Sequence, residues 1–144
     1  NRKGGENPAK VVEDLREMMQ NKVGIIRTEK LLKEALQDLD DLEVRSRNTY
    51  AGDSRVYNPG WHQALELDAM IDVSRMCALA ALYRKESRGG HTRDDFPVPD
   101  YKYWGKINSV ITKKDEMSIE HRSYPPIDKE LKKLLDVEDL HEEE

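Results

Sequence analysis

The sequence predicts a mainly α-helical protein, an antiparallel three-helix bundle of the spectrin-repeat kind over residues 8–90. Three observations support this fold class. Three segments carry apolar residues at spacings of three and four, the period of one helix face. Two of them begin with Asn-Pro, an N-cap residue followed by the residue favoured at the first helical position. After Pro97 the helical period is lost, which predicts an irregular segment, a short β-hairpin and a short final helix.

The first two helices each show a start signal and one apolar stripe. The first is predicted to begin at Pro8 with Asn7 as its N-cap, and the second to begin after Thr28. Gly24 is expected to break or bend the chain between them. The first stripe comprises Val11, Val12, Leu15, Met18, Met19 and Val23. The second comprises Leu31, Leu32, Ala35, Leu36, Leu39 and Leu42. Such stripes can be buried only against one another or against a partner.

The third helix is the longest and most apolar of the three, so we expect it at the centre of the bundle. It is predicted to follow a loop over residues 48–58 and to run from about Trp61 to Arg88. Its predicted core positions are Trp61, Ala64, Leu65, Met70, Val73, Met76, Cys77, Ala80 and Ala81. We interpret Cys77 as a small buried hydrophobic residue, because a reactive thiol needs a cationic, partly exposed setting.

The C-terminal third is predicted to be an extension over residues 91–135 that packs on the bundle or on another domain. Residues 106–112 and 117–124 are two short β-leaning runs, which a four-residue turn over 113–116 would join into a hairpin. Asp128 is expected to cap the last helix, whose apolar residues are Leu131, Leu134 and Leu135. Residues 136–144 are interpreted as an acidic tail, and residues 1–7 as a flexible N-terminal segment.

Composition narrows the classes of function. At 144 residues the length suits one domain, and the mean hydropathy of −0.87 is low. A net charge of −5 argues against nucleic acid as a partner, because binding phosphates requires a cationic face. A single cysteine cannot form an internal disulfide, and no apolar run has the length of a membrane span, so we predict no direct membrane insertion. Because the chain begins with Asn1, we expect a fragment or a processed product.

The densest group of chemically versatile residues is Glu-Ser-Arg-Gly-Gly-His-Thr-Arg-Asp-Asp-Phe-Pro, residues 86–97. The structural interpretation is a helix C-terminus with Gly89 as the C′ residue and basic residues in the last turn. His91 with Asp94 and Asp95 offers too few ligands for a divalent metal. We reject a catalytic triad of Ser87, His91 and Asp95, because closeness in sequence does not create its geometry. The local arginines are offset by acids, which favours ion pairing within or between domains.

The same twelve residues resemble a signature of the succinate dehydrogenase/fumarate reductase flavoprotein subunits, E-S-R-G-(A/G)-H-x-R-(E/D)-D-(F/Y)-P. Every position from Glu86 to Pro97 matches. The segments Val23 to Glu29, Ala64 to Met70, Asp100 to Trp104 and Tyr124 to Pro126 are also similar to the family. The resemblance therefore covers roughly residues 8–127.

This resemblance implies the C-terminal helical domain of a subunit that interconverts succinate and fumarate on FAD and passes electrons to an iron–sulfur subunit. FAD would be bound elsewhere in that subunit, because none of the eight glycines here forms a G-x-G-x-x-G phosphate cradle. The fragment would be a non-catalytic brace that binds no cofactor and no metal. It would contact the FAD-binding domain through Arg88, His91, Arg93 and Asp95.

The family's membrane complexes imply a cytoplasmic location, peripheral to the inner face of the cell membrane. Apolar surface that the missing domain normally covers would let the isolated fragment self-associate. The alternative hypothesis is a free-standing three-helix interaction module with no redox role. A Gly-rich dinucleotide-binding pattern some hundreds of residues upstream of Asn1 would support the flavoprotein hypothesis, and a start codon at residue 1 would support the module.

Overall fold

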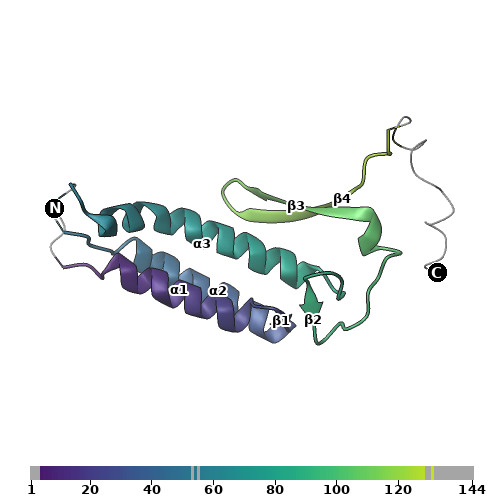
Figure 1. The fold of residues 1–144 in the computed structure, drawn as a ribbon, viewed down its shortest axis with the longest axis horizontal. Helices are drawn as coiled ribbons and strands as arrows, with labels where there is room; N and C mark the ends of the chain where they lie inside the picture. The colour runs from purple at the N-terminus through teal and green to yellow at the C-terminus, as the bar shows by residue number, and fades with distance from the viewer. Residues whose placement is uncertain (1–3, 53, 55, 129–130, 132–144) are drawn as a thin grey trace.

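Three long helices lie side by side in the computed structural model, with a β-hairpin next to the third of them (Figure 1). The structure describes residues 4–52, 54, 56–128 and 131. The helices are α1 (Pro8–Lys22), α2 (Glu29–Ser46) and α3 (Pro59–Tyr83). The mainly α-helical fold class predicted from the sequence is confirmed. None of the helices among the described residues is both long and apolar enough to cross a bilayer.

All three helices begin where the sequence predicts. The side chain of Asn7 accepts a hydrogen bond from the Ala9 amide at 3.0 Å, and that of Thr28 accepts one from Leu31 at 3.3 Å. Asn58 accepts one from Trp61 at 3.2 Å. Each cap satisfies one of the amides that a helix start leaves without an intrahelical acceptor, and is worth about 1 kcal/mol.

The core is formed by one face of each helix. The predicted stripes of α1 and α2 are confirmed as its main contributors, and α3 adds fewer residues. The buried apolar residues of this cluster are Val11, Val12, Leu15, Met18, Val23, Leu32, Ala35, Leu39, Leu42, Leu67, Ile71, Ala78 and Ala81. The chain turns between α1 and α2 at Gly24, where a Cβ would overlap the carbonyl oxygen of Gln20. The predicted break at Gly24 is thus confirmed.

The predicted core face of α3 is partly wrong, although Ala81 is buried and Met70 packs against the core as predicted. Leu67, Ile71 and Ala78 are buried, although the sequence analysis did not choose them. Leu65 is 62% exposed and Val73 59% exposed, although both were predicted to be core residues. Because α3 is apolar on most of its sides, its residues at helical spacing fit more than one face.

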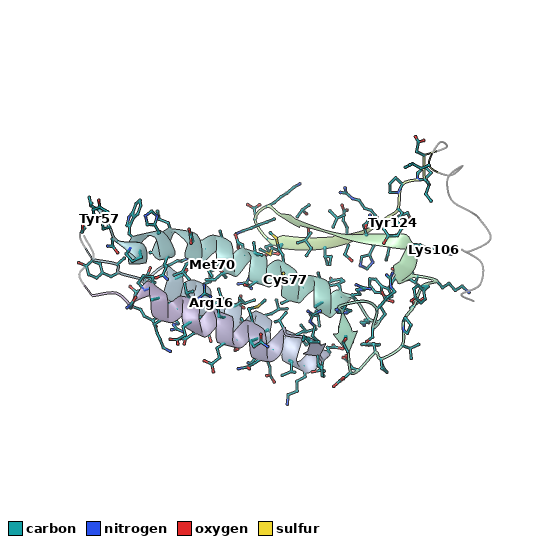
Figure 2. The ribbon with its side chains drawn as sticks, in the orientation of Figure 1. Arg16, Tyr57, Met70, Cys77, Lys106 and Tyr124 are labelled. Atoms are coloured by element: carbon teal, nitrogen blue, oxygen red, sulfur yellow. The ribbon has the colours of Figure 1, made fainter. Side chains whose placement is uncertain are left out.

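Cys77 is a second correction on α3. It was interpreted as a buried hydrophobic residue, but it is exposed on α3, where Figure 2 labels it. It lies on the outer side of a helix whose core positions are Ile71, Ala78 and Ala81. The wrong choice of helix face therefore also explains this error.

The end of α3 is also earlier than predicted. The helix ends at Tyr83, five residues before Arg88, and Arg84 already has an extended backbone with φ −77° and ψ 103°. Gly89 is therefore not a C′ residue, although its φ of +61° lies in the left-handed region that glycine favours. It lies instead in a tight turn in which the backbones of Arg88 and His91 form hydrogen bonds with each other.

Two short parallel strands join the start of α2 to the loop that follows α3. Strand β1 (Ile26–Arg27) pairs with β2 (Thr92–Arg93), with Arg27 opposite Arg93. The Asp94 amide donates to the carbonyl oxygen of Arg27 at 3.0 Å and extends this contact. The pairing brings residues 66 positions apart to one end of the helical layer.

At the other end of the helices, part of the predicted flexible segment is paired. The Glu6 amide donates to the carbonyl oxygen of Asn48, and the Tyr50 amide donates to that of Glu6. The side chain of Glu6 also accepts from Arg45 Nε at 2.9 Å. Residues 4–7 are thereby attached to the loop after α2.

The predicted hairpin is confirmed. Strands β3 (Ile107–Lys113) and β4 (Met117–Ser123) are antiparallel, with Ile107 opposite Ser123 and Lys113 opposite Met117. The connecting loop thus has three residues, 114–116, rather than the four predicted. A 3-10 turn, η1 (Trp104–Lys106), leads into the hairpin. Of the predicted final helix and acidic tail, all but Asp128 and Leu131 lie outside the described residues.

The two candidate faces of α3 can be distinguished by a matched pair of substitutions. We expect Leu67→Ala to lower the free energy of unfolding by about 2–5 kcal/mol, because the side chain is 0% exposed and its loss leaves a cavity. Leu65→Ala, two residues away, should change it by no more than about 0.5 kcal/mol. Urea denaturation of the 144-residue chain measures both. Equal losses would contradict this assignment of the core face.

Candidate functional site

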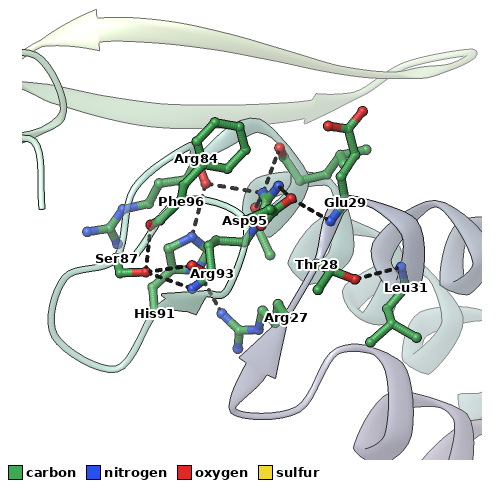
Figure 3. A network of polar contacts seen from close by, with 12 residues as sticks. Arg27, Thr28, Glu29, Leu31, Arg84, Ser87, His91, Arg93, Asp95 and Phe96 are labelled. Atoms are coloured by element: carbon green, nitrogen blue, oxygen red, sulfur yellow. Dashed lines mark hydrogen bonds and ion pairs between the residues drawn. The ribbon is translucent and has the colours of Figure 1, made fainter. Parts of the chain in front are cut away.

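The signature residues fold into a loop, residues 84–98, that closes over the end of α3 and reaches the start of α2 (Figure 3). Most of its charged side chains bind one another, backbone carbonyl groups or helix termini. Arg93, Glu86 and His91 are 0%, 0% and 7% exposed. Burial at this level requires that each polar group be satisfied, because an unpaired buried charge is strongly unfavourable.

Arg93 lies at the centre of this loop. Its Nη1 is 2.8, 3.1 and 3.3 Å from the carbonyl oxygens of Ala81, Leu82 and Arg84, which the end of α3 leaves without intrahelical donors. A guanidinium here also complements the negative end of the helix dipole. Its planar group stacks on Phe96, with Cζ 5.0 Å from the ring centroid. These contacts explain why α3 ends at Tyr83, since donors from the loop replace those of a further helical turn.

Asp95 connects the same arginine to α2. Both of its carboxylate oxygens accept from Arg93, Nε and Nη2 each donating at 2.7 Å. One of them also accepts from the Glu29 amide, at 2.8 Å, in the first turn of α2. The Arg93 hydrogen bonds, with the Glu29 amide, outweigh burial and lower the pKa of Asp95 to about 2. The carboxylate is therefore ionised at neutral pH and lies at the positive end of the α2 dipole.

His91 is held as one neutral tautomer by its two partners. Arg27 Nη1 lies 2.8 Å from Nδ1, and the carbonyl oxygen of Arg84 lies 3.0 Å from Nε2. A guanidinium can only donate and a carbonyl can only accept, so Nδ1 accepts and Nε2 carries the proton. Burial lowers the pKa of His91, and the nearby charges of Arg84, Arg27 and Arg93 lower it further.

Glu86 organises the outer part of the loop. Its Oε1 accepts from Nε of Arg84 at 2.8 Å and from Nε of Arg88 at 3.1 Å, and its Oε2 accepts from the Asp100 amide at 2.8 Å. Burial alone would raise the pKa of Glu86, but these hydrogen bonds outweigh it and the pKa is lowered. Arg88 further donates to the carbonyl oxygen of Trp104 at 3.0 Å and stacks on Tyr101.

The arrangement does not form a catalytic triad. The Ser87 hydroxyl accepts from the Arg93 amide and lies 3.1 and 2.8 Å from the carbonyl oxygens of Arg93 and Phe96. His91 and Asp95 bind other partners, as described above. Among the residues that the structure describes, no three His, Cys, Asp or Glu side chains gather as a metal site would require.

The loop contains all four residues selected from the sequence, Arg88, His91, Arg93 and Asp95. Arg93 and His91 lie inside the loop, whereas the Arg88 side chain keeps 27% of its surface exposed. Ion pairing between the local arginines and acids was predicted, and Glu86 does bind Arg84 and Arg88. Neither Glu86 nor Arg27 was among the selected site residues, because the sequence does not show that Arg27 reaches His91.

Comparisons with known proteins agree with this geometry. A family model described as the C-terminal part of the fumarate reductase flavoprotein matches residues 12–138. The chain belongs to this family. The resemblance to succinate dehydrogenase and fumarate reductase flavoprotein subunits, inferred above from residues 86–97, is confirmed.

Named relatives and solved structures match in the same region. The succinate dehydrogenase flavoprotein subunit of Coxiella burnetii is 37% identical over 102 residues, which are 70% of this chain and 17% of that protein. The fumarate reductase flavoprotein subunit of Helicobacter pylori is 36% identical, over 70% of this chain and 14% of that protein. A structure of Mycobacterium smegmatis Sdh1 in complex with UQ1 aligns with a TM-score of 0.82 and 36% identity, covering 94% of this chain and 24% of that one.

The chain thus spans about a fifth of the length of the curated relatives that it matches, from 14% to 21% for the first three. Another of these relatives is named as an FAD-dependent oxidoreductase of Methanocaldococcus jannaschii and is 38% identical over 125 residues. The chain shares the fold of this region with the Mycobacterium smegmatis protein.

The role of Arg93 can be tested by a substitution that keeps its charge. In Arg93→Lys a single ammonium cannot bind the α3 carbonyl groups and both oxygens of Asp95, so we expect a loss of about 3 kcal/mol in the free energy of unfolding. The control is Arg122→Lys, because Arg122 pairs with Glu120 on the exposed hairpin and should change stability by less than about 0.5 kcal/mol. Urea denaturation gives both values. Similar effects of the two substitutions would contradict the central role of Arg93.

His91 should make stability depend on pH. Its folded-state pKa lies below the unfolded value of about 6.5, so protonation favours unfolding. The contribution of neutral His91 to the free energy of unfolding should be complete above about pH 6.5. It should decrease as the pH falls toward the lowered pKa of the folded state. Glu86 and Asp95 act in a separate window, below their ordinary values of 4.5 and 3.8. Thermal midpoints measured between pH 7.5 and 5 should therefore fall in the wild-type chain.

The matched variants for this measurement are His91→Gln and His62→Gln. Glutamine can also donate and accept a hydrogen bond but does not titrate, so the first should flatten the slope. His62 is exposed on α3, and its replacement should leave the slope as in wild type. An unchanged slope in His91→Gln would show that another group is responsible.

Proposed function

We propose that this chain is the C-terminal structural domain of an FAD-dependent succinate dehydrogenase or fumarate reductase flavoprotein subunit, and that it braces the flavin domain without performing chemistry. The observation that carries the proposal is that the family signature consists of groups that bind one another. Arg93, Asp95, Glu86 and His91 have their partners inside the loop or at helix ends. Such a network fixes the shape of a surface, and it leaves these groups little freedom to act on a substrate.

We place FAD outside this chain. A dinucleotide cradle needs a strand, a Gly-rich turn and a helix start whose amides face the pyrophosphate. In the described part of the chain the only parallel strands, β1 and β2, have two residues each, and neither precedes a Gly-rich turn. The FAD-binding domain of the same subunit is then the primary partner. In the assembled enzyme, that domain would interconvert succinate and fumarate and pass electrons to an iron–sulfur subunit, with the complex peripheral to the inner face of the cell membrane.

We assign different parts of the interdomain contact to the four signature residues. Arg93 and His91 hold the loop in shape from within, and Asp95 attaches it to α2. Arg88, which remains partly exposed and lies at the outer part of the loop, reaches the neighbouring domain. The short connection between α1 and α2, residues 23–28, supports an antiparallel arrangement of these two helices, and we propose a spectrin-like bundle for the brace. The exposed apolar residues Leu65 and Val73 on α3 are candidates for contact with that domain, or for self-association when it is missing.

The proposal is tested by producing the FAD-binding part of the subunit with and without this chain. We expect the two polypeptides to copurify, and we expect FAD retention and succinate dehydrogenase activity only when both are present. The 144-residue chain alone should show no flavin absorption band. If the FAD-binding part retains FAD and activity equally well without this chain, the brace function is wrong and an independent interaction module is favoured.

A further inference from the structure

A hollow outside the buried network lies between the end of α3, the loop and the base of the hairpin. Its volume is about 270 Å³. Arg84 and Arg88 line one side, Asn108 and Ser109 of β3 line another, and Trp104 and Tyr124 form aromatic walls. Tyr124 lies beside Lys106 at the base of the hairpin, where Figure 2 labels both and the Tyr124 amide donates to the Lys106 carbonyl oxygen.

The charges around this hollow do not balance. Glu86 Oε1 is shared by Nε of Arg84 and Nε of Arg88, so two guanidinium groups face one carboxylate. Neither Nη1 group has a hydrogen-bond acceptor among the residues that the structure describes. Both charged residues that line the hollow are arginines. Within the described part of the chain, one positive charge beside the hollow is therefore left without a counter-charge, and the Nη1 groups of both arginines are left without acceptors.

We propose that this hollow binds a carboxylate, supplied by an Asp or Glu side chain of the FAD-binding part of the same subunit. Guanidinium N–H groups match the two oxygens of a carboxylate, and aromatic walls strengthen the interaction by excluding water. The Asn108 amide and the Ser109 hydroxyl add neutral hydrogen-bonding groups. Glu86 holds both guanidinium groups from behind, so the site is organised before an anion enters. The choice of this partner rests on the function proposed above.

The surroundings of the hollow favour a protein partner. Tyr101 contacts Arg88, and Tyr103 packs against Trp104 with ring centroids 5.1 Å apart. Both tyrosines are about half exposed, at 50% and 51%. Exposed tyrosines beside arginines are typical of the centre of protein interfaces. The polypeptide that would supply the acid is long, because this chain spans about a fifth of its relatives.

The site can first be probed in the 144-residue chain with sodium acetate, which is the isolated carboxylate group. We expect saturable changes in the NMR signals of the Trp104 indole and the amides of Asn108 and Ser109, and none with sodium chloride at equal ionic strength. Arg88→Gln should weaken acetate binding about tenfold, whereas Arg122→Gln on the exposed hairpin should not change it. Shifts that do not saturate, or that persist unchanged in Arg88→Gln, would overturn the proposal.

A second pair of variants avoids the buried network. Ser109→Asp places a carboxylate in the hollow from β3, and Ser109→Asn is its neutral control of similar size. The acidic variant should lose acetate binding, and in the complete subunit it should lower FAD retention and the association of this domain with the FAD-binding part. If it loses acetate binding but docks normally, the hollow accepts a free carboxylate and the interdomain source is wrong. If the wild-type domain does not associate at all, the proposed brace function fails, while the acetate result still decides whether the anion site exists.

Discussion

The fold of this domain depends on one ion pair, between the buried Arg93 and the partly exposed Asp95, that connects the ends of two helices. Arg93 binds the last carbonyl groups of α3, Asp95 binds the first amide of α2, and the two side chains bind each other through two parallel hydrogen bonds. Each charge thus lies at the helix end of opposite sign. This pair satisfies the last carbonyl groups of α3, binds the first amide of α2 beside the Thr28 cap, and closes the loop that follows α3. Salt should weaken it less than a pair on the surface, because Arg93 is 0% exposed and only the Asp95 side chain reaches solvent.

Burying an arginine imposes requirements on the rest of the loop. Desolvation of a charge is repaid only when nearly all of its hydrogen bonds are made. Ser87 binds the Arg93 backbone, and Phe96 covers its guanidinium. The Arg84 carbonyl oxygen is shared by Arg93 and His91, and His91 is oriented in turn by Arg27. Each of these groups thus depends on the next. This dependence gives a physical reason why residues 86–97 combine charged, polar and aromatic side chains.

Much of the fold could be predicted from the sequence, and the failures have physical causes. Local signals sufficed for α1, α2, the three N-caps and the hairpin, because each depends on residues close together in the chain. The core face of α3 could not be chosen, since Leu65 and Val73 match a helical period as well as Leu67 and Ile71 do. The end of α3 was placed too late because its last carbonyl groups are satisfied by Arg93, nine or more residues further along the chain. The four candidate residues were found as a group. The sequence could not show that Arg93 and His91 are buried, because their burial depends on contacts with segments distant in the chain.

The same network separates what stabilises the domain from what can recognise a partner. Arg93, Asp95 and His91 have partners within the chain, so changing them alters the fold first. At the outer part of the loop, Arg84 and Arg88 share one carboxylate, and their Nη1 groups have no acceptor among the described residues. Glu86 joins the two regions, because it orients the outer arginines while its other oxygen fixes the Asp100 backbone. The arginines at the outer surface are therefore already held in place before a partner binds. Binding then costs less side-chain conformational entropy than it would with freely rotating arginines.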